Sequence, residues 1–196
     1  MGKSARRRRE RMPPTNASAP AVVPGPWPTW PAGESARWPS IALVVGIALV
    51  ARVVALAAMT ATPYLRIDNI DARSYHAWAN GILAGAWLPA GHFYQSPVYA
   101  YYLAVVAAFC GDSPWPPRVI QALHGAASTG LLTVIGATIF DRRVGVIAGL
   151  LLAIYGPMIL EEISLGKTSL LVFGSLVGFM LFLRALVEHI RQVDGF

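Results

Sequence analysis

Four apolar runs, each close to the length of a membrane-spanning helix, constrain this chain more than any other feature. They cover residues 41–61, 119–140, 144–160 and 170–187. A helix needs roughly 20 apolar residues to cross the hydrocarbon core of a bilayer. Only 13% of the residues are charged, whereas a soluble domain carries about a quarter. The sequence therefore predicts an all-α integral membrane protein with about four transmembrane helices.

A fifth apolar run, residues 98–110, is too short to be counted with the others and is bounded by Pro97 and Gly111. Runs of this length are more often interfacial than spanning. If this run lies flat, the Asp141-Arg142-Arg143 turn falls on the same side as the basic N-terminus, as the positive-inside rule prefers. We therefore expect both termini inside, a long external loop over residues 62–117 and a second external loop over about 160–169.

A second interfacial helix is expected within the first external loop. Apolar and small residues recur at three- and four-residue spacing from Ile67 to Ile82, and Trp78 lies among them. Such a pattern is typical of a helix that lies along the membrane surface with a tryptophan at the headgroups. Asp68, Asp71 and Tyr75 occupy a neighbouring stripe of this helix, so the acids are expected to face away from lipid.

The N-terminal 40 residues differ from the rest of the chain. They hold six basic residues within the first eleven positions and are rich in proline. Basic runs bind nucleic acid in some proteins, but ahead of a span they are more often a cytoplasmic topology signal. Residues 1–40 are therefore predicted to be a disordered cytoplasmic tail near membrane lipids, with no nucleic-acid partner. Residues 41–187 form the transmembrane part, and residues 188–196 a cytoplasmic end.

Polar residues inside the predicted spans need partners. Arg52 lies near the middle of the first span, where a lipid-facing charge costs about 2.5–3.5 kcal/mol or more. It is therefore expected to face protein or a wet cavity. Gln121 and His124 form a polar seam on the second span, which suits either a functional cavity or a helix–helix contact. The small residues Gly125, Gly130 and Gly136 on the same span suit close helix packing.

Metal binding is not indicated. Cys110 is the single cysteine, which excludes an internal disulfide and a cysteine metal cluster. His76 and His92 lie near Asp68 and Asp71, but their spacing matches no standard ligand motif. We predict no protein-bound metal site and no certain cofactor; a weakly held divalent cation stays an alternative.

An ordered set of short motifs resembles the motifs of a known family. They are Asp71 with Tyr75 and HAWA over residues 76–79, FYQSPVYAYYLA over 93–104, PPRVIQALHGA over 116–126, FDRR over 140–143, and AIYGPMILEEISLGKTSLLVF over 153–173. In this order they resemble the GT-C-fold membrane glycosyltransferases, in particular the bacterial relatives of protein O-mannosyltransferases and of the aminoarabinose transferase of lipid A. The resemblance implies transfer of a sugar from a polyprenyl-phosphate-linked donor to an acceptor on the external side of a bacterial inner membrane.

Family enzymes have more spans than this sequence holds. We therefore expect it to be the N-terminal portion of such an enzyme. The alternative is a noncatalytic transmembrane subunit that packs against other transmembrane subunits in a larger complex. The sugar and the acceptor are not indicated by the sequence.

The resemblance also implies roles for individual residues. Asp71 matches the first-loop aspartate proposed as general base, since an acceptor hydroxyl or amine loses a proton as it attacks the anomeric carbon. Asp68, one turn earlier, would orient the acceptor or bind a cation, and Tyr75 would contact substrate.

The remaining candidates lie near the donor. Arg118 matches an arginine at the start of a span and suits bidentate contact with the donor phosphate; the alternative is a side chain that snorkels from a helix end. Glu161 or Glu162 would complete an acidic pocket opposite Asp71, with Lys167 beside the fourth span. The alternative there is a solvated loop that caps a helix.

Overall fold

A computed structural model describes residues 34–62, 70–88 and 95–194. Their helices are α1 (Glu34–Thr60), α2 (Ile70–Leu83), α3 (Pro97–Cys110), α4 (Trp115–Ile139), α5 (Arg142–Ala153), α6 (Gly156–Ile163) and α7 (Thr168–Asp194). No strand occurs in these ranges, so the predicted all-α class is confirmed. Asp68, His92 and residues 1–33 of the predicted tail lie outside the described residues.

In the part of the chain that the structure describes, three helices are long and apolar enough to cross a membrane: α1 from Trp38 to Thr60, α4, and α7 from Thr168 to Ile190. The third predicted span is broken rather than continuous. It consists of α5 and α6, whose axes differ by 49°. Pro157 has no N–H to donate to the carbonyl of Ala153 four residues earlier, which ends the α5 ladder there. The count is four spans if this bent pair crosses as one.

Two predicted boundaries change. The helix α1 begins at Glu34, inside the predicted tail of residues 1–40, with Pro39 within it. As the sixth helical residue, Pro39 has no N–H to donate to the carbonyl four residues earlier, and the helix continues through it. The predicted loop over 160–169 is also shorter, because α6 continues to Ile163 and α7 begins at Thr168.

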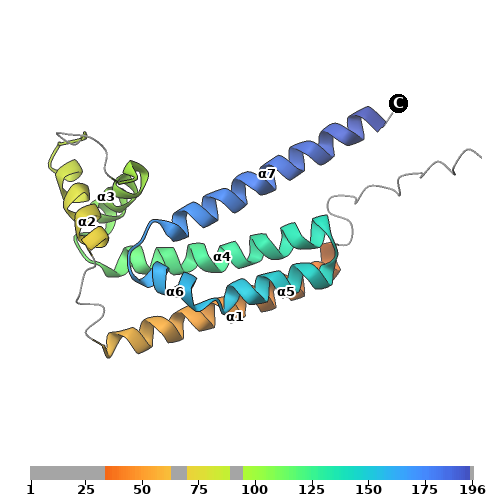
Figure 1. Cartoon of the computed structure of the whole chain (residues 1–196), viewed down its shortest axis with the longest axis horizontal. Coiled ribbons are helices and arrows are strands. Elements are labelled where there is room, and N and C mark those ends of the chain that lie inside the picture. Colours follow the sequence, from red (N-terminus) through yellow and green to blue (C-terminus); the bar gives the residue numbers. More distant parts are fainter. Residues whose placement is uncertain (1–33, 63–69, 89–94, 195–196) are drawn as a thin grey trace, which may run out of the picture.

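Helices α1, α4 and α5 lie side by side as the packed part of the bundle (Figure 1). Glycines allow their backbones to approach closely. A Cβ on Gly136 of α4 would lie 2.9 Å from Gly145 Cα of α5, and one on Gly130 would lie 3.0 Å from Val45 Cγ2 of α1. The predicted packing role of these small residues is thereby confirmed. Helix α7 contacts α4 and α6 and then diverges from the bundle.

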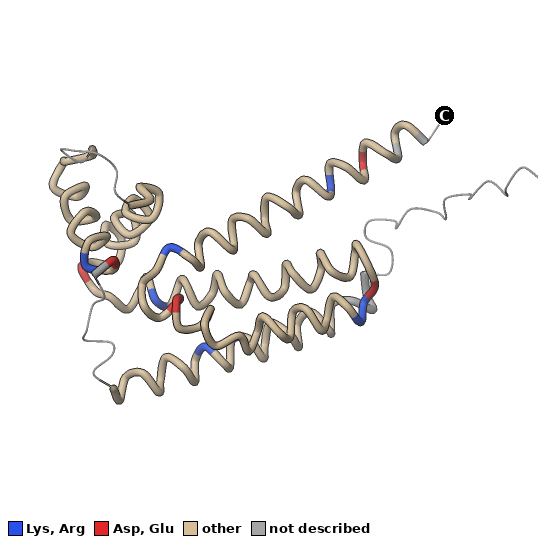
Figure 2. The backbone as a smooth tube through the Cα atoms, viewed as in Figure 1, with Lys and Arg blue, Asp and Glu red and all other residues tan. Residues whose placement is uncertain are grey.

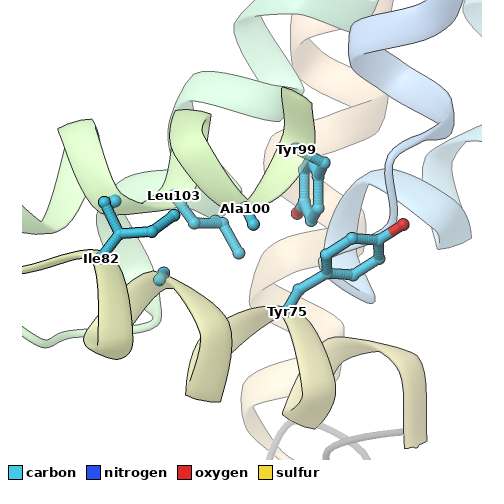
Figure 3. Packing of buried hydrophobic residues seen from close by; sticks show 7 residues of the cluster. Tyr75, Ile82, Tyr99, Ala100 and Leu103 are labelled. Carbon is cyan, nitrogen blue, oxygen red and sulfur yellow. The ribbon is translucent and has the colours of Figure 1, made fainter. Parts of the chain in front are cut away.

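Helices α2 and α3 pack on each other at one end of the bundle, near the start of α4 (Figure 1). Both elements were predicted from the sequence, at nearly these bounds. Their shared core contains Tyr75, Ala79, Ile82, Tyr99, Ala100, Leu103 and Ala104. Tyr75 lies against Tyr99 at one end of this core and Ile82 lies near Leu103 at the other (Figure 3). Packing in this core sets the position of α2 relative to α3, and with it the position of the first turn of α2.

Candidate functional site

Charged positions concentrate where α2, the start of α4 and the α6–α7 connection come together (Figures 1 and 2). Further charges lie at the α4–α5 turn and on the distal half of α7 (Figure 2). Most candidate residues from the sequence are therefore at one end of the molecule. They differ sharply in burial and in their partners.

Asp71 lies in the first turn of α2 and is exposed. Its Oδ1 accepts a hydrogen bond of 2.9 Å from Gln95 Nε2, just ahead of α3. An acid at a helix N-terminus is favoured by the helix dipole. The carboxylate is therefore oriented by one amide and still reachable from solvent, which suits a group that accepts a proton from an incoming molecule.

Tyr75 points into the α2–α3 core instead of outward. Its side chain is 3% exposed, and its ring meets the edge of Tyr99 at a centroid distance of 4.8 Å and an angle of 82°. Such edge-to-face pairs are a preferred aromatic arrangement. Contact with substrate stays a prediction for Tyr75; in this arrangement its role is to fix the helix that bears Asp71.

Gln121 connects α3, α4 and the α6–α7 connection. Its buried amide donates to Tyr99 Oη at 2.8 Å and to Gly166 O at 2.7 Å. Burial raises the pKa of Tyr99, which keeps its hydroxyl neutral. One turn later, the His124 ring stacks on Phe173 of α7 at 5.0 Å. Of the two alternatives for this polar seam, the geometry favours a contact between helices.

Arg118 holds the end of α6. Its Nε donates to the carbonyl of Ile163 at 2.9 Å, and the residue is 5% exposed. Ile163 is the last residue of α6, where a cation complements the negative end of the helix dipole. The predicted contact with a donor phosphate is untested, and the guanidinium as placed binds protein backbone.

Arg52 and Glu162 form a buried ion pair between α1 and α6. Arg52 Nε lies 2.7 Å from Glu162 Oε2 and Nη2 lies 2.8 Å from Oε1, with side chains 2% and 1% exposed. Arg52 Nη1 donates to Ala48 O at 3.1 Å and Ala153 O at 3.4 Å. The second carbonyl is the one that Pro157 leaves without a helical donor. Arg52 faces protein, as the sequence predicts, and it stabilises the break between α5 and α6.

The partner of Arg52 was not expected. The sequence placed Glu162 in an external loop opposite Asp71, whereas the structure places it within α6 and against α1. The apolar neighbours of Glu162 and the nearby Gly156-Pro157 break were the available signals. Gly125 of α4 completes this site, since a Cβ there would lie 2.0 Å from Glu162 Oε1 and 2.5 Å from Arg52 Nε.

Glu161 in the last turn of α6 and Lys167 just before α7 are both exposed. Thr168 Oγ1 donates to Glu161 Oε2 at 3.2 Å, and Gly166 N donates to Glu161 O at 3.3 Å. The second bond closes α6 in a Schellman-type turn. Leu165 occupies the left-handed position of that turn, with a φ of 58°, where glycine is the usual residue.

The part of the chain that the structure describes contains no group of three or more His, Cys, Asp or Glu residues arranged to hold a metal. His76 Nε2 lies 2.9 Å from Asp112 Oδ1 at the turn before α4. Sequence reasoning also missed Gln95, which orients Asp71. No spacing pattern marks it, because the contact joins the starts of two helices across a long connection.

The fold and these contacts define a helical membrane protein with exposed charged residues at its ends and a buried Arg52–Glu162 ion pair inside. A family profile described as dolichyl-phosphate-mannose-protein mannosyltransferase matches residues 94–192, about half of the chain. The chain belongs to this family, which confirms the resemblance to GT-C-type glycosyltransferases. The family indicates glycosyltransferase activity of the membrane mannosyltransferase type. No curated protein and no solved structure matches the chain.

The matched segment contains Arg118, Glu161, Glu162 and Lys167, and it begins after Asp71. The match that shows the family therefore rests on the segment from α3 to α7. It does not itself test the roles of individual residues.

Proposed function

We propose that this protein takes part in transferring a sugar from a polyprenyl-phosphate-linked donor to an acceptor on the external side of the membrane, with Asp71 as general base. The observation that supports this role is the exposed carboxylate of Asp71, oriented by Gln95 at the end of the bundle where α2 and α3 pack. Residence in a bacterial inner membrane stays a prediction.

The proposed reaction forms a bond between the acceptor oxygen or nitrogen and the anomeric carbon of the sugar. The acceptor proton passes to the Asp71 carboxylate, and the bond from the anomeric carbon to the phosphate oxygen breaks. The lipid phosphate leaves with the bonding electrons. A positioned base assists such a step because the acceptor becomes acidic only as it attacks. The lipid anchor of the donor explains why the base belongs beside a membrane.

We assign the contact with the donor phosphate to Lys167 rather than to Arg118. Lys167 is exposed at the start of α7, whereas Arg118 is buried with its Nε on Ile163 O. A cation near the leaving phosphate stabilises the charge that develops there. Glu161 lies in the last turn of α6, across the connection from Lys167, and Glu162 is paired with Arg52 at the break between α5 and α6.

Transfer assays on membranes that contain the protein test this proposal. Asp71→Asn is expected to lower turnover by about 10²- to 10⁴-fold, the usual contribution of a general base. Asp112→Asn is the matched control, because Asp112 is also an exposed acid at this end but is paired with His76. Equal loss in both variants, or none in Asp71→Asn, would remove Asp71 from the mechanism. If the wild-type protein transfers no sugar from the lipid-phosphate donor, the alternative of a noncatalytic subunit is favoured.

Orientation is tested separately with membrane-impermeant thiol reagents on intact cells. Cys110 is exposed at the end of α3 and is expected to react from outside. In a Cys110→Ser background, Phe140→Cys at the α4–α5 turn is expected to react only after the membrane is opened. Phe140 is 72% exposed, so packing against the rest of the protein does not block the reagent. Labelling of position 140 from outside would contradict the proposed topology.

A further inference from the structure

We propose that the end of the bundle opposite α2 and α3 binds one anionic phospholipid of the surrounding bilayer. The site is an open pocket between the start of α1 and the start of α5. Its lining consists of Ser40, Arg142, Arg143, Val146 and Ile147. The proposal does not depend on the reaction assigned above.

The cationic edge of this pocket has the chemistry of a phosphate site. Arg142 and Arg143 are both exposed, and guanidinium groups form paired, charge-assisted hydrogen bonds to phosphate oxygens. Arg142 Nη2 donates to Ser40 Oγ, which holds one guanidinium against α1 before any ligand arrives. Asp141, which precedes the two arginines in sequence, is the N-cap of α5 and accepts from Val144 N at 2.9 Å.

The rest of the lining favours a lipid over a free phosphate ion. Val146 and Ile147 follow the two arginines by three to five residues on α5, so they lie on the same side one turn further along. Ile147 is 57% exposed. A cationic edge followed by an apolar surface matches a phospholipid, which has an anionic headgroup followed by an acyl chain.

The position of the pocket supports the same ligand. Helix α1 is a candidate span, and α5 with α6 forms the bent pair that passes the same test. Both begin at this end of the bundle (Figure 1), where a bilayer places its headgroups. Arginines near the ends of spans are attracted to anionic lipid surfaces. What distinguishes this site from general attraction is the Ser40–Arg142 contact, which joins two helices beneath the headgroup.

Native mass spectrometry of the full chain, released from detergent, tests the proposal with defined lipids. Dioleoyl-phosphatidylglycerol is expected to stay bound as a single molecule at concentrations where dioleoyl-phosphatidylcholine does not. Arg142→Gln with Arg143→Gln is expected to weaken phosphatidylglycerol binding by about tenfold or more, since charge-assisted hydrogen bonds are lost. Arg73→Gln on α2 with Arg184→Gln on α7 removes the same charge away from this pocket and is expected to leave binding unchanged.

Three results would overturn the proposal. They are equal binding of phosphatidylglycerol by the wild type and the Arg142/Arg143 variant, equal loss in the control variant, and displacement of the lipid by millimolar inorganic phosphate. The last would show an anion site without lipid recognition. If the double variant loses helicity by circular dichroism, Ser40→Ala decides instead, because it removes only the hydroxyl that holds Arg142. It is expected to weaken phosphatidylglycerol binding several-fold, and unchanged binding would reject the site.

Discussion

Glu162 and Asp71 show two different uses of a carboxylate in one small membrane protein. Glu162 lies inside the bundle, 1% exposed, with both oxygens bonded to Arg52. Asp71 lies exposed at the start of α2 with a single amide contact among the described residues. The first charge is fully occupied in holding α1 to α6. The second is oriented but retains an accessible oxygen, which is the arrangement that proton transfer needs.

The surroundings of the two groups explain this difference. Inside an apolar bundle an isolated charge is too costly to keep, so Glu162 is found only with its counter-ion. At the end of the bundle water solvates a carboxylate, and Asp71 needs no counter-ion. The burial of the Arg52–Glu162 pair therefore indicates a structural role. The exposure of Asp71 leaves its carboxylate accessible to a reacting molecule.

The largest expected effect comes from breaking the buried pair on one side. Arg52→Leu is expected to lower the free energy of unfolding by about 3–5 kcal/mol, because Glu162 would be left buried without a counter-ion. Arg52→Leu with Glu162→Leu is expected to recover much of that loss. Denaturant unfolding in detergent micelles, followed by circular dichroism, measures both. Asp71→Asn is the surface control and is expected to change stability by no more than about 0.5 kcal/mol.

This comparison fails if the double variant is as unstable as Arg52→Leu alone. That result would mean that the hydrogen bonds from Arg52 to Ala48 O and Ala153 O dominate, and not the ion pair. It would also fail if Asp71→Asn destabilised the protein as strongly as Arg52→Leu.

A smaller effect is expected from filling the space beside the pair. Gly125→Ala places a Cβ 2.0 Å from Glu162 Oε1, so the pair or α4 has to shift, at an expected cost of about 1–3 kcal/mol. Gly46→Ala on α1 is the matched control, because nothing lies within 4 Å of its Cβ. It is expected to be neutral or to stabilise by up to about 1 kcal/mol through helix propensity. The same unfolding measurement compares them, and equal values would show that the ion pair adapts freely.

The sequence predicted the elements of this fold well, because long apolar runs and short proline-bounded segments leave few alternatives. The bounds of α3 and the existence of α2 followed from run length and spacing alone. The break between α5 and α6 was missed, although Pro157 lies within the predicted span. A proline inside an apolar run is compatible with a kink as well as a break, and local sequence does not decide which one tertiary contacts select.

The site was predicted less completely for a related physical reason. Burial of Arg52 followed from the cost of a charge in lipid, which needs no knowledge of the fold. Its partner required knowing that α6 packs against α1, a contact 110 positions apart in sequence. Gly125 was recognised as a packing residue but not as the space for the pair. The Gln95 contact with Asp71 likewise depends on how two helix starts meet.

The smallest expected effect is the difference between substitutions at Tyr99 and Tyr102 of α3. It tests how firmly the end that bears Asp71 is attached to the bundle. Tyr99 Oη accepts from Gln121 Nε2 at 2.8 Å, whereas the Tyr102 hydroxyl is buried without a hydrogen-bond partner in the part of the chain that the structure describes. Tyr99→Phe is expected to lower the free energy of unfolding by about 1 kcal/mol, since one buried hydrogen bond is lost. Gln121 keeps its bond to Gly166 O, which limits the loss.

Tyr102→Phe is expected to be neutral or slightly stabilising, because it removes a buried hydroxyl that has no partner to lose. Burial already raises the pKa of Tyr102 to about 12, so neither variant changes the charge of this end at neutral pH. Unfolding in micelles at neutral pH gives the difference between the two variants directly. Equal destabilisation by both would show that the ring positions, and not the Tyr99–Gln121 hydrogen bond, attach α3 to α4.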